Sequence, residues 1–388
     1  MRKICVITGT RAEFGLLSGL MRLIQQSEQT TLQVVATNMH LSERYGYTYR
    51  EIEEAGFPID YKVPMLDENG VNDSTATLKA MSRALSRFAE AYDVLQPDLI
   101  VVLGDRYEIL AAVEAALIKQ IPIAHIHGGE LTFGAYDDAI RHSITKMSHL
   151  HFVSTAEYKK RVVQLGEEPE RVFNVGALGV ENIKHVPLMK KEEVEEDLKF
   201  EIGYKTLLIT YHPVTLSDSD PIDEINALFA ALNEHPDLRV IFTMPNSDTG
   251  GQVIADAIER YVEEHTDKVR AYKSLGMKRY LSVMKYCAAV VGNSSSGILE
   301  TPSFHIPTLN IGSRQDGRMA ADSVYNCGTN KESISAGLDY ILSDKFREIA
   351  ANTTNPYEKE GTAQAIFDII SIYPLEGIIK KQFYDYER

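Results

Sequence analysis

Residues 292–300 have the sequence Gly-Asn-Ser-Ser-Ser-Gly-Ile-Leu-Glu, and they give the first indication of the fold. The apolar run Ala288–Val291 comes directly before them, and Thr301 and Pro302 come directly after. An apolar run followed by small residues and a further apolar pair predicts a buried strand, a tight turn and the start of a helix. This order of elements is typical of α/β proteins, in which strands alternate with helices.

The same stretch is a candidate phosphate site. Small residues allow the backbone to close around a phosphate group, and the hydroxyls of Ser294 and Ser295 can donate hydrogen bonds to it. A helix N-terminus adds positive potential at the same place. Glu300, expected about two turns into the helix, can accept hydrogen bonds from two neighbouring sugar hydroxyls, as acidic residues do with ribose. The alternative is a serine-rich turn whose side chains only cap the helix.

Length and charge limit the classes of function. The chain has 388 residues, which predicts roughly two to three domains, and its formal net charge is -15. This charge argues against a nonspecific grip on nucleic acid or on an anionic membrane, because both need clustered basic residues. The three cysteines, Cys5, Cys287 and Cys327, are not spaced as metal ligands, and we expect reduced, buried thiols. No apolar run reaches membrane-spanning length and no leader pattern precedes the first strand, so we expect a cytoplasmic protein.

The N-terminus begins with a similar strand, turn and helix pattern. Residues 4–7 form an apolar run, residues 8–15 contain a glycine turn, and leucines recur with helical spacing from residue 16 to 24. The turn lacks the full spacing of a dinucleotide fingerprint. Arg11 follows the carboxyl end of the strand, where open α/β sheets bind ligands, although an arginine exposed to solvent would also fit.

Two further strand ends carry charged residues. The apolar run 99–103 leads into Asp105 and Arg106, and Asp105 can either bind a ligand or cap the following helix. The apolar run 121–126 opens a segment of eighteen residues with three acids, three histidines and an arginine: His125, His127, Glu130, Asp137, Asp138, Arg141 and His142. Such a concentration of titratable groups indicates an acid/base site. A zinc site is the weaker alternative, because His-x-His here lacks a thiolate and a fitting third ligand.

The second half of the chain repeats the alternation of strands and helices after a hinge expected around residues 172–179. Three apolar runs end near a polar residue: 206–211 before His212, 240–243 before Asn246, and 309–311 before Arg314. In both halves, therefore, each strand brings a polar side chain to the same edge of a sheet.

With these motifs the chain resembles, over essentially its whole length, the hydrolysing UDP-N-acetylglucosamine 2-epimerases of the bacterial sialic-acid pathway. The motifs are Gly-Thr-Arg-Ala-Glu (9–13), Leu-Gly-Asp-Arg-Tyr-Glu (103–108), His-Ile-His-Gly-Gly-Glu (125–130), Asp-Asp-x-Ile-Arg-His-Ser-Ile-Thr-Lys (137–146), Gly-Asn-Ser-Ser-Ser-Gly (292–297) and Gly-x-Arg-Gln-x-Gly-Arg (312–318). The resemblance implies the glycosyltransferase-B architecture, with two Rossmann-like α/β domains facing each other across a cleft. We expect these domains at residues 1–175 and 176–372, followed by a C-terminal helix within residues 373–388 that packs back on the first domain.

The resemblance also implies a reaction. In that family the C2 proton of the sugar is removed and UDP leaves from C1, giving a glycal; water then adds, and N-acetylmannosamine is released. No metal and no nicotinamide cofactor is implied. Such a route needs acid/base groups on both faces of the sugar ring and cationic donors for the diphosphate. By resemblance, the catalytic residues are Asp105, Glu130, Asp137 and His212.

The resemblance likewise implies a set of substrate-binding residues. UDP is expected mainly on the C-terminal domain, with phosphate on the two serines and ribose on the glutamate of the opening stretch. The residues are Arg11, Arg106, His127, Asn246, Ser294, Ser295, Glu300 and Arg314. His127 stands where relatives in the broader superfamily carry glutamate, so either its imidazole replaces that acid or Glu130 supplies it.

Other functions fit parts of this pattern. The same chemistry can act on UDP-N,N'-diacetylbacillosamine, which differs from UDP-N-acetylglucosamine at C4 and C6 of the sugar. The fold and UDP site would also serve a retaining glycosyltransferase or a UDP-sugar sensor without activity. Asp105, Glu130 and Asp137 argue against both, because neither needs so many acids beside C2. The expected partner is a small nucleotide sugar, with no nucleic acid or membrane, and the resemblance implies a homodimer.

Overall fold

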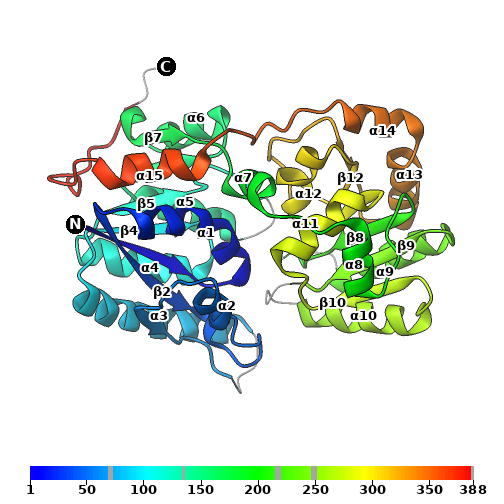
Figure 1. Cartoon of the computed structure of the whole chain (residues 1–388), viewed down its shortest axis with the longest axis horizontal. Helices are drawn as coiled ribbons and strands as arrows, with labels where there is room; N and C mark the ends of the chain where they lie inside the picture. The colour runs from blue at the N-terminus through cyan, green and yellow to red at the C-terminus, as the bar shows by residue number, and fades with distance from the viewer. Residues whose placement is uncertain (69–72, 133–135, 215–219, 246–250, 386–388) are drawn as a thin grey trace. The chain divides into compact units, whose positions relative to one another are not determined.

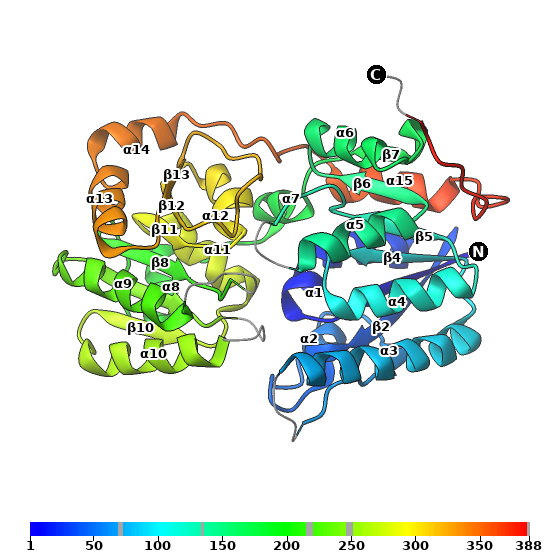
Figure 2. The same cartoon turned by 180° about the vertical axis from the view of Figure 1, so that it is seen from behind.

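The computed structural model describes residues 1–68, 73–132, 136–214, 220–245 and 251–385. Its contacts divide the chain into two compact units. Unit 1 comprises Met1–Glu130, Asp137–Asn182 and Lys359–Arg388, and unit 2 comprises Leu131–Tyr136 and Ile183–Glu358. Each unit is a parallel sheet flanked by helices (Figures 1 and 2), which confirms the prediction of two Rossmann-like α/β domains.

Unit 1 contains a seven-stranded parallel sheet in the order β3-β2-β1-β4-β5-β6-β7. Its strands are β1 (Arg2–Thr8), β2 (Thr30–Thr37), β3 (Tyr61–Val63), β4 (Leu99–Leu103), β5 (Ile123–Ile126), β6 (Leu150–Val153) and β7 (Val172–Asn174). Its helices are α1 (Arg11–Gln26), η1 (Asn38–Leu41), α2 (Tyr49–Glu54), α3 (Ser74–Leu95), α4 (Tyr107–Ile118), α5 (Asp137–Met147), α6 (Ala156–Gln164), η2 (Pro169–Arg171) and α15 (Thr362–Ile372). Helix α7 (Leu178–His185) crosses the boundary between the units. The strand order reverses between β1 and β4.

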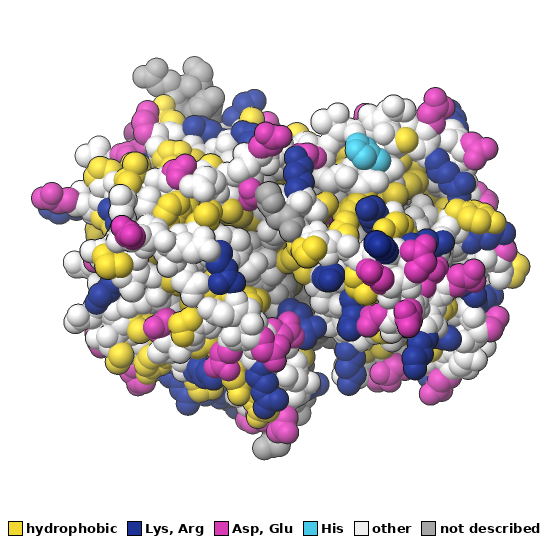
Figure 3. Space-filling view, in the orientation of Figure 1, with side chains coloured by type: hydrophobic (Ala, Val, Ile, Leu, Met, Phe, Trp, Pro, Cys, Tyr) yellow, Lys and Arg dark blue, Asp and Glu magenta, His cyan; other side chains and the backbone are white. Residues whose placement is uncertain are grey.

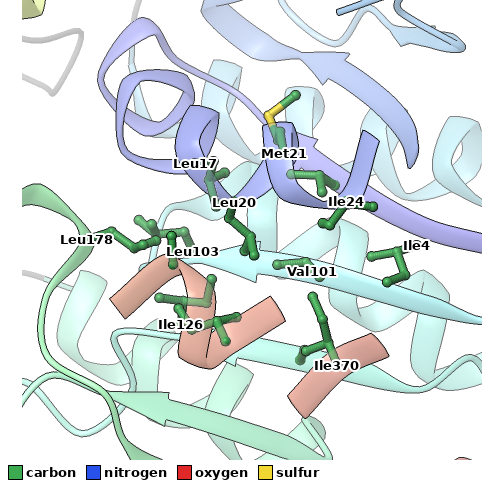
Figure 4. Packing of buried hydrophobic residues seen from close by; sticks show 14 of the residues in the cluster. Ile4, Leu17, Leu20, Met21, Ile24, Val101, Leu103, Ile126, Leu178 and Ile370 are labelled. Carbon is green, nitrogen blue, oxygen red and sulfur yellow. The ribbon is translucent and has the colours of Figure 1, made fainter. Parts of the chain in front are cut away.

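Alternate residues of the unit 1 strands supply two hydrophobic cores, one on each face of the sheet. Ile4 and Val6 of β1 belong to the core shown in Figure 4, whereas Cys5 and Ile7 belong to the other core. A strand with period two produces this alternation when helices cover both faces. Helices α1 and α15 fill the core in Figure 4, with side chains that include Leu17, Leu20, Met21, Ile24 and Ile370.

Unit 2 contains a six-stranded parallel sheet in the order β10-β9-β8-β11-β12-β13. Its strands are β8 (Thr206–Thr210), β9 (Arg239–Thr243), β10 (Val269–Tyr272), β11 (Ala289–Gly292), β12 (Thr308–Ile311) and β13 (Val324–Cys327). Its helices are α8 (Lys191–Leu198), α9 (Pro221–Asn233), α10 (Gly251–Glu264), α11 (Gly276–Tyr286), α12 (Ser296–Leu299), η3 (Thr301–Phe304), α13 (Lys331–Ile341) and α14 (Asp344–Ala351). Here the strand order reverses between β8 and β11.

The C-terminal part of the chain differs from the prediction. The last helix of the described residues is α15, which ends at Ile372, and residues 373–385 contain no helix. The residue before a proline is disfavoured in helical conformation, so Pro374 explains the end of the helix before Tyr373. Helix α15 belongs to unit 1, because its apolar side chains complete the core beside α1. The chain therefore passes between the units after Glu130, Tyr136, Asn182 and Glu358, whereas the prediction has one boundary, at residue 175.

Surface and thiol chemistry agree with the composition. Acidic and basic side chains are intermixed over the face shown in Figure 3. Within the described parts of the chain, no helix is both long and apolar enough to cross a membrane. Cys5 and Cys287 are buried free thiols and Cys327 is partly buried. Burial raises the pKa of all three thiols, which keeps them protonated.

Candidate functional site

In unit 1 the predicted acids lie at the carboxyl edge of the sheet, close to the point where the strand order reverses. The turn at residues 9–10 follows β1, and Gly104–Arg106 follows the neighbouring strand β4. In open α/β sheets, ligands bind in the crevice that such a reversal creates. The topology therefore brings Arg11, Asp105 and Arg106 to the edge where a ligand is expected.

Asp105 is held at this edge by a buried ion pair. Gly104 has a φ of +79°, which glycine adopts readily, and it turns the chain out of β4. Arg106, not Asp105, is the N-cap residue of α4, so the helix-cap alternative for Asp105 does not hold. The Asp105 carboxylate accepts a hydrogen bond from Nη2 of Arg141. The side chain of Arg141 is 3% exposed and that of Asp105 19%, so the pair is fixed from inside while part of the carboxylate stays open.

Arg141 connects the acids of unit 1, a role that the sequence analysis did not assign to it. Its Nη1 atom donates to the carbonyl oxygen of Glu130 at 2.9 Å and lies 3.7 Å from Oδ1 of Asp138. Burial lowers the pKa of Arg141, but the surrounding carboxylates, above all Asp105, raise it above its ordinary value. The sequence does contain one indication of this role, because Arg141 lies one helical turn after Asp137 and therefore on the same face of α5.

His127 and Glu130 lie together after β5. His127 has a φ of +67°, uncommon for a residue other than glycine, and its amide donates to the carbonyl of Phe152 at 2.9 Å. Its Nδ1 atom is 3.7 Å from Oε1 of Glu130, and that oxygen also accepts a hydrogen bond from Oγ of Ser154 at 3.0 Å. Both side chains are buried, so the structure places imidazole and carboxylate in one group beside Asp105 and Arg141.

The remaining predicted residues of unit 1 are Asp137, Arg106 and Arg11, and their contacts differ. Asp137 is the first residue of α5, and its side chain is partly buried. Arg106 donates from Nε to Oε1 of Glu108 at 2.8 Å. Arg11 forms an ion pair with Glu51 of α2, so it is held in a separate group from the Arg141 cluster.

His125 supports the acid group from inside the sheet. Its Nε2 atom lies 2.8 Å from the carbonyl oxygen of Gly104, and Nδ1 lies 3.2 Å from the hydroxyl of Thr145. Burial lowers the pKa of His125 to about 3, so its ring is neutral at neutral pH. A Cβ atom on Gly128 would lie 2.9 Å from the Thr145 hydroxyl, which explains a glycine at that place in the motif.

In unit 2 the corresponding edge is organised by Asn293, another residue without a predicted role. Its Oδ1 atom accepts from the amide of His212 at 2.7 Å, and its Nδ2 atom donates to the carbonyl of His212 at 2.8 Å. Its own carbonyl accepts from Arg314 at 3.1 Å and from Gln315 at 2.8 Å. Asn293 thus joins the ends of β8, β11 and β12 and brings the predicted residues His212 and Arg314 next to the serine turn.

The turn before Asn293 requires a glycine. Gly292 has a φ of +127°, and a Cβ atom there would lie 2.0 Å from the carbonyl oxygen of Thr210. Any other residue would collide with the neighbouring strand. The close approach of β8 and β11, where the strand order reverses, therefore depends on a glycine at position 292.

The helix after the serine turn is shorter than predicted. Helix α12 has four residues, and Glu300 is its C-cap residue rather than lying two turns into it. Pro302 explains the difference, because proline lacks the amide that a continuing helix needs. Ser295 is the N-cap residue but makes no side-chain capping bond, so the helix-cap alternative for its hydroxyl does not hold. Ser294 Oγ instead accepts from the amide of Ser296 at 3.4 Å.

Glu300 nevertheless stays within reach of the turn. Its Oε2 atom accepts a hydrogen bond from the hydroxyl of Ser296, and burial raises the pKa of Glu300. Asn246, the remaining predicted residue of this half, lies outside the described residues. Among the described side chains, no group of three or more His, Cys, Asp or Glu is arranged to hold a metal ion.

Comparison with known proteins gives the same assignment as the motifs. The sequence pattern described as UDP-N-acetylglucosamine 2-epimerase matches residues 22–371. The chain belongs to this family. Of the six motifs quoted from the sequence, five lie at the carboxyl end of a strand, namely β1, β4, β5, β11 and β12, and the sixth lies in α5.

Three relatives illustrate the family. A Campylobacter jejuni protein named GDP/UDP-N,N'-diacetylbacillosamine 2-epimerase (hydrolyzing) is 43% identical over 89% of each chain. The polysialic acid biosynthesis protein P7 of Escherichia coli is 38% identical over 100% of this chain and 97% of that one. The crystal structure of UDP-GlcNAc 2-epimerase from Neisseria meningitidis bound to UDP-GlcNAc has a TM-score of 0.79 at 18% identity, covering 95% of this chain and 99% of that one. The last comparison concerns the fold.

Proposed function

We propose that this protein is a hydrolysing 2-epimerase that converts a UDP-linked 2-acetamido sugar and water into UDP and the free sugar epimerised at C2. The observation that carries the proposal is the group of Asp105, His127 and Glu130 around the buried cation Arg141 at the carboxyl edge of the unit 1 sheet. The names of the relatives with 43% and 38% identity, a hydrolysing 2-epimerase and a polysialic acid biosynthesis protein, support the same chemistry.

In the first half of the proposed reaction, a base takes the C2 proton, a double bond forms between C1 and C2, and the C1–oxygen bond breaks with its electron pair leaving on UDP. In the second half, the oxygen of water bonds to C1 and a proton returns to C2 from the opposite face. Two acid/base groups on different sides of the ring are therefore needed. Asp105, Glu130 and Asp137 are the proposed groups, with His127 beside Glu130 as an imidazole that can share its proton.

Unit 2 carries the proposed nucleotide site. Ser294 and Ser295 follow β11, and the hydroxyl of Ser295 makes no capping bond to α12. Both hydroxyls are proposed to donate to the diphosphate. Arg314 and His212, joined through Asn293, supply the cation and the imidazole for the departing phosphate. Glu300, hydrogen-bonded by Ser296, is proposed to receive the ribose hydroxyls.

Two sugars are candidate substrates. UDP-N-acetylglucosamine, which yields N-acetylmannosamine for sialic-acid synthesis, is the substrate expected from the sequence. UDP-N,N'-diacetylbacillosamine is favoured as a second candidate by the name of the relative at 43% identity. Both carry the acetamido group at C2 and the UDP at C1 on which the proposed chemistry acts, so the choice between them concerns only C4 and C6.

The proposal is tested by incubating the protein with each UDP-sugar and identifying the products by NMR. We expect UDP and a free sugar with inverted C2, at an equal rate with or without EDTA, and a kcat/KM that is at least tenfold higher for one of the two sugars. Asp105→Asn serves as the inactive reference. Release of free sugar with unchanged C2, or transfer of the sugar to an added acceptor, would overturn the proposal in favour of a hydrolase or glycosyltransferase. We also propose that the active form is a homodimer, as the resemblance implies.

A further inference from the structure

Two buried glutamates that the proposed mechanism does not use meet at Gly9 in unit 1. Glu13 of α1 accepts hydrogen bonds on Oε2 from the amides of Gly9 at 2.6 Å and Thr10 at 3.2 Å. Glu108 of α4 is fully buried, and a Cβ atom on Gly9 would lie 2.6 Å from its Oε1. Both carboxyl groups therefore reach the same glycine at the end of β1.

A single guanidinium serves this pair in the contacts of the described residues. Arg106 donates from Nε to Oε1 of Glu108 at 2.8 Å, and the Arg106 side chain is partly open to solvent. The second oxygen of each acid, Oε1 of Glu13 and Oε2 of Glu108, is buried and has no hydrogen-bond partner among the described residues. Burying two uncompensated negative charges side by side is costly, so one carboxyl group is expected to keep its proton.

Arg106 donates its hydrogen bond to Glu108, which favours the charged form of that acid, so Glu13 is the acid expected to keep the proton. Burial raises the pKa of Glu13 to about 8, and the nearby charge of Glu108 also raises it. The amides of Gly9 and Thr10 and the charge of Arg106 lower this pKa by a smaller amount. His40, which bonds to the Thr8 hydroxyl at 3.1 Å, has its pKa lowered by burial to about 4 and brings no charge at neutral pH. Arg11, the first residue of α1, is paired with Glu51.

We propose that Glu13 and Glu108 together hold one proton and that this proton is on Glu13. The charged Glu108 alone then holds Arg106 in the position in which Arg106 binds the nucleotide sugar. Glu13 and Glu108 are then positioning residues, since neither is placed on the substrate. The inference rests on the proposed function in that Arg106 is taken as a substrate-binding residue. If Glu13 loses its proton, Arg106 faces two negative charges instead of one and is drawn from the ligand toward the acids.

The test compares the parent protein with Glu13→Gln, Glu108→Gln and a control, Glu90→Gln, at an exposed position of α3. KM and kcat for the UDP-sugar are measured from pH 6 to pH 9.5. For the parent and the control, KM should rise with a midpoint near pH 8, where Glu13 ionises, while kcat changes less. Glu13→Gln, which mimics the protonated acid, should not show this rise. Glu108→Gln should raise KM at pH 7 about tenfold, because Arg106 loses a charge-assisted hydrogen bond.

A second readout does not depend on activity. The pKa of Glu13 is about 8 in the folded protein, above its ordinary value of 4.5. The contribution of this group to the free energy of unfolding is therefore complete below pH 4.5 and is lost as the pH rises to about 8. Urea unfolding should therefore show that Glu13→Gln gains stability relative to the parent and to Glu90→Gln between pH 5 and pH 8.5. This comparison needs only Glu13→Gln and the parent, so it stands even if Glu108→Gln does not fold.

The two proposals fail in different ways. A parent protein that turns over neither UDP-sugar would overturn the proposed function, while the unfolding comparison would still report on the shared proton. A constant stability difference between Glu13→Gln and the parent across the pH range would overturn the shared proton. A KM of Glu108→Gln equal to that of Glu90→Gln would overturn the positioning of Arg106.

Discussion

In each unit, one buried polar residue organises the candidate site residues of that unit. Arg141 holds the carboxylate of Asp105 and the backbone of Glu130, and Asn293 holds His212 and Arg314 through its side chain and carbonyl. Groups of this kind fix the proposed catalytic side chains before a ligand arrives, which is the condition under which electrostatic stabilisation of a transition state is most effective. The acids themselves remain the residues on which turnover should depend.

Replacing each proposed acid by its amide tests this dependence. Asp105→Asn, Glu130→Gln and Asp137→Asn should each lower kcat by roughly 10²- to 10⁴-fold, the usual contribution of a general acid or base. UDP affinity, measured by calorimetry, should stay close to that of the parent, because the proposed nucleotide site lies in unit 2. Glu157→Gln, at an exposed position of α6, is the control. A loss below about tenfold at any of the three would remove that residue from the catalytic group.

The serine turn makes a separate prediction for UDP. Ser295→Ala and Glu300→Gln should each raise the Kd for UDP about tenfold or more, since a hydrogen bond to a charged group contributes roughly 1.5–3 kcal/mol. Ser343→Ala is the matched control, because Ser343 does cap a helix by accepting from the amide of Phe346 at 3.3 Å. That control should lose about 1 kcal/mol of stability without changing UDP affinity. Unchanged UDP affinity in both site variants would reduce residues 292–300 to a structural turn.

The organising roles of Arg141 and Asn293 could not be predicted from the sequence. The acids at strand ends are visible because buried parallel strands are continuous apolar runs, and the residue after each run stands at the ligand edge. Arg141 is 36 residues from Asp105, and Asn293 is 21 residues from Arg314, so their contacts depend on tertiary structure. The local sequence pattern shows that a motif contains a charged or polar residue, but it does not show which distant residue that side chain contacts.

At the scale of elements, the segment after α15 is fixed to unit 1 by a buried ionic group. Lys381 donates from Nζ to the carbonyls of Lys146 at 2.6 Å and Ser148 at 2.7 Å, at the end of α5. The same nitrogen lies 2.7 Å from Oε2 of Glu167, which also contacts His151 at 2.8 Å. Burial opposes ionisation of Glu167, but the bonds from His151, Lys146 and Lys381 lower its pKa to about 2. The tail therefore carries a charge partner for a buried carboxylate.

Lys381→Met should accordingly lower the free energy of unfolding by on the order of 3 kcal/mol, because removing one member of a buried pair leaves a poorly compensated charge. Lys380→Met, at the exposed neighbouring position, is the control and should change stability little. Urea unfolding followed by circular dichroism measures the difference. Equal midpoints for the two variants would mean that the tail contributes nothing through this contact.

Element boundaries show where local pattern is sufficient and where it is not. The strand and turn at residues 4–10 and at 99–104 are found as predicted, since their apolar runs are long enough to be buried. The helix expected after residue 295 is present but has only four residues and ends before Pro302, and residues 373–385, which contain Pro374, form no helix. At both places the proline disfavours a continuing helix, but the charged or apolar residues around it favoured the prediction of one.

The proposed homodimer needs a surface through which two copies of the chain can bind each other. Leu78 and Leu85 of α3 are 66% and 39% exposed, and their spacing of seven residues puts them on one face of the helix. Exposed large apolar side chains that gather on one element often mark protein contacts. This face of unit 1 is the place where we expect a second copy to bind.

The double substitution Leu78→Glu and Leu85→Glu should therefore convert a dimer into a monomer in sedimentation equilibrium. Val253→Glu, at a 48% exposed position of α10 in unit 2, should leave the molecular mass unchanged. A parent protein that sediments as a monomer would contradict the homodimer itself, whereas a double variant that stays dimeric would place the contact elsewhere.

In the proposed reaction, the acids of unit 1 exchange the C2 hydrogen of a UDP-linked sugar while UDP departs. Turnover of the UDP-sugar in deuterated water, followed by NMR and mass spectrometry of the released sugar, tests this most directly. One solvent deuterium should appear at C2 of the epimerised product, because the proton removed there is replaced from water after the glycal forms. Product that carries hydrogen at C2 in its original configuration would mean cleavage at C1 alone and would contradict the account.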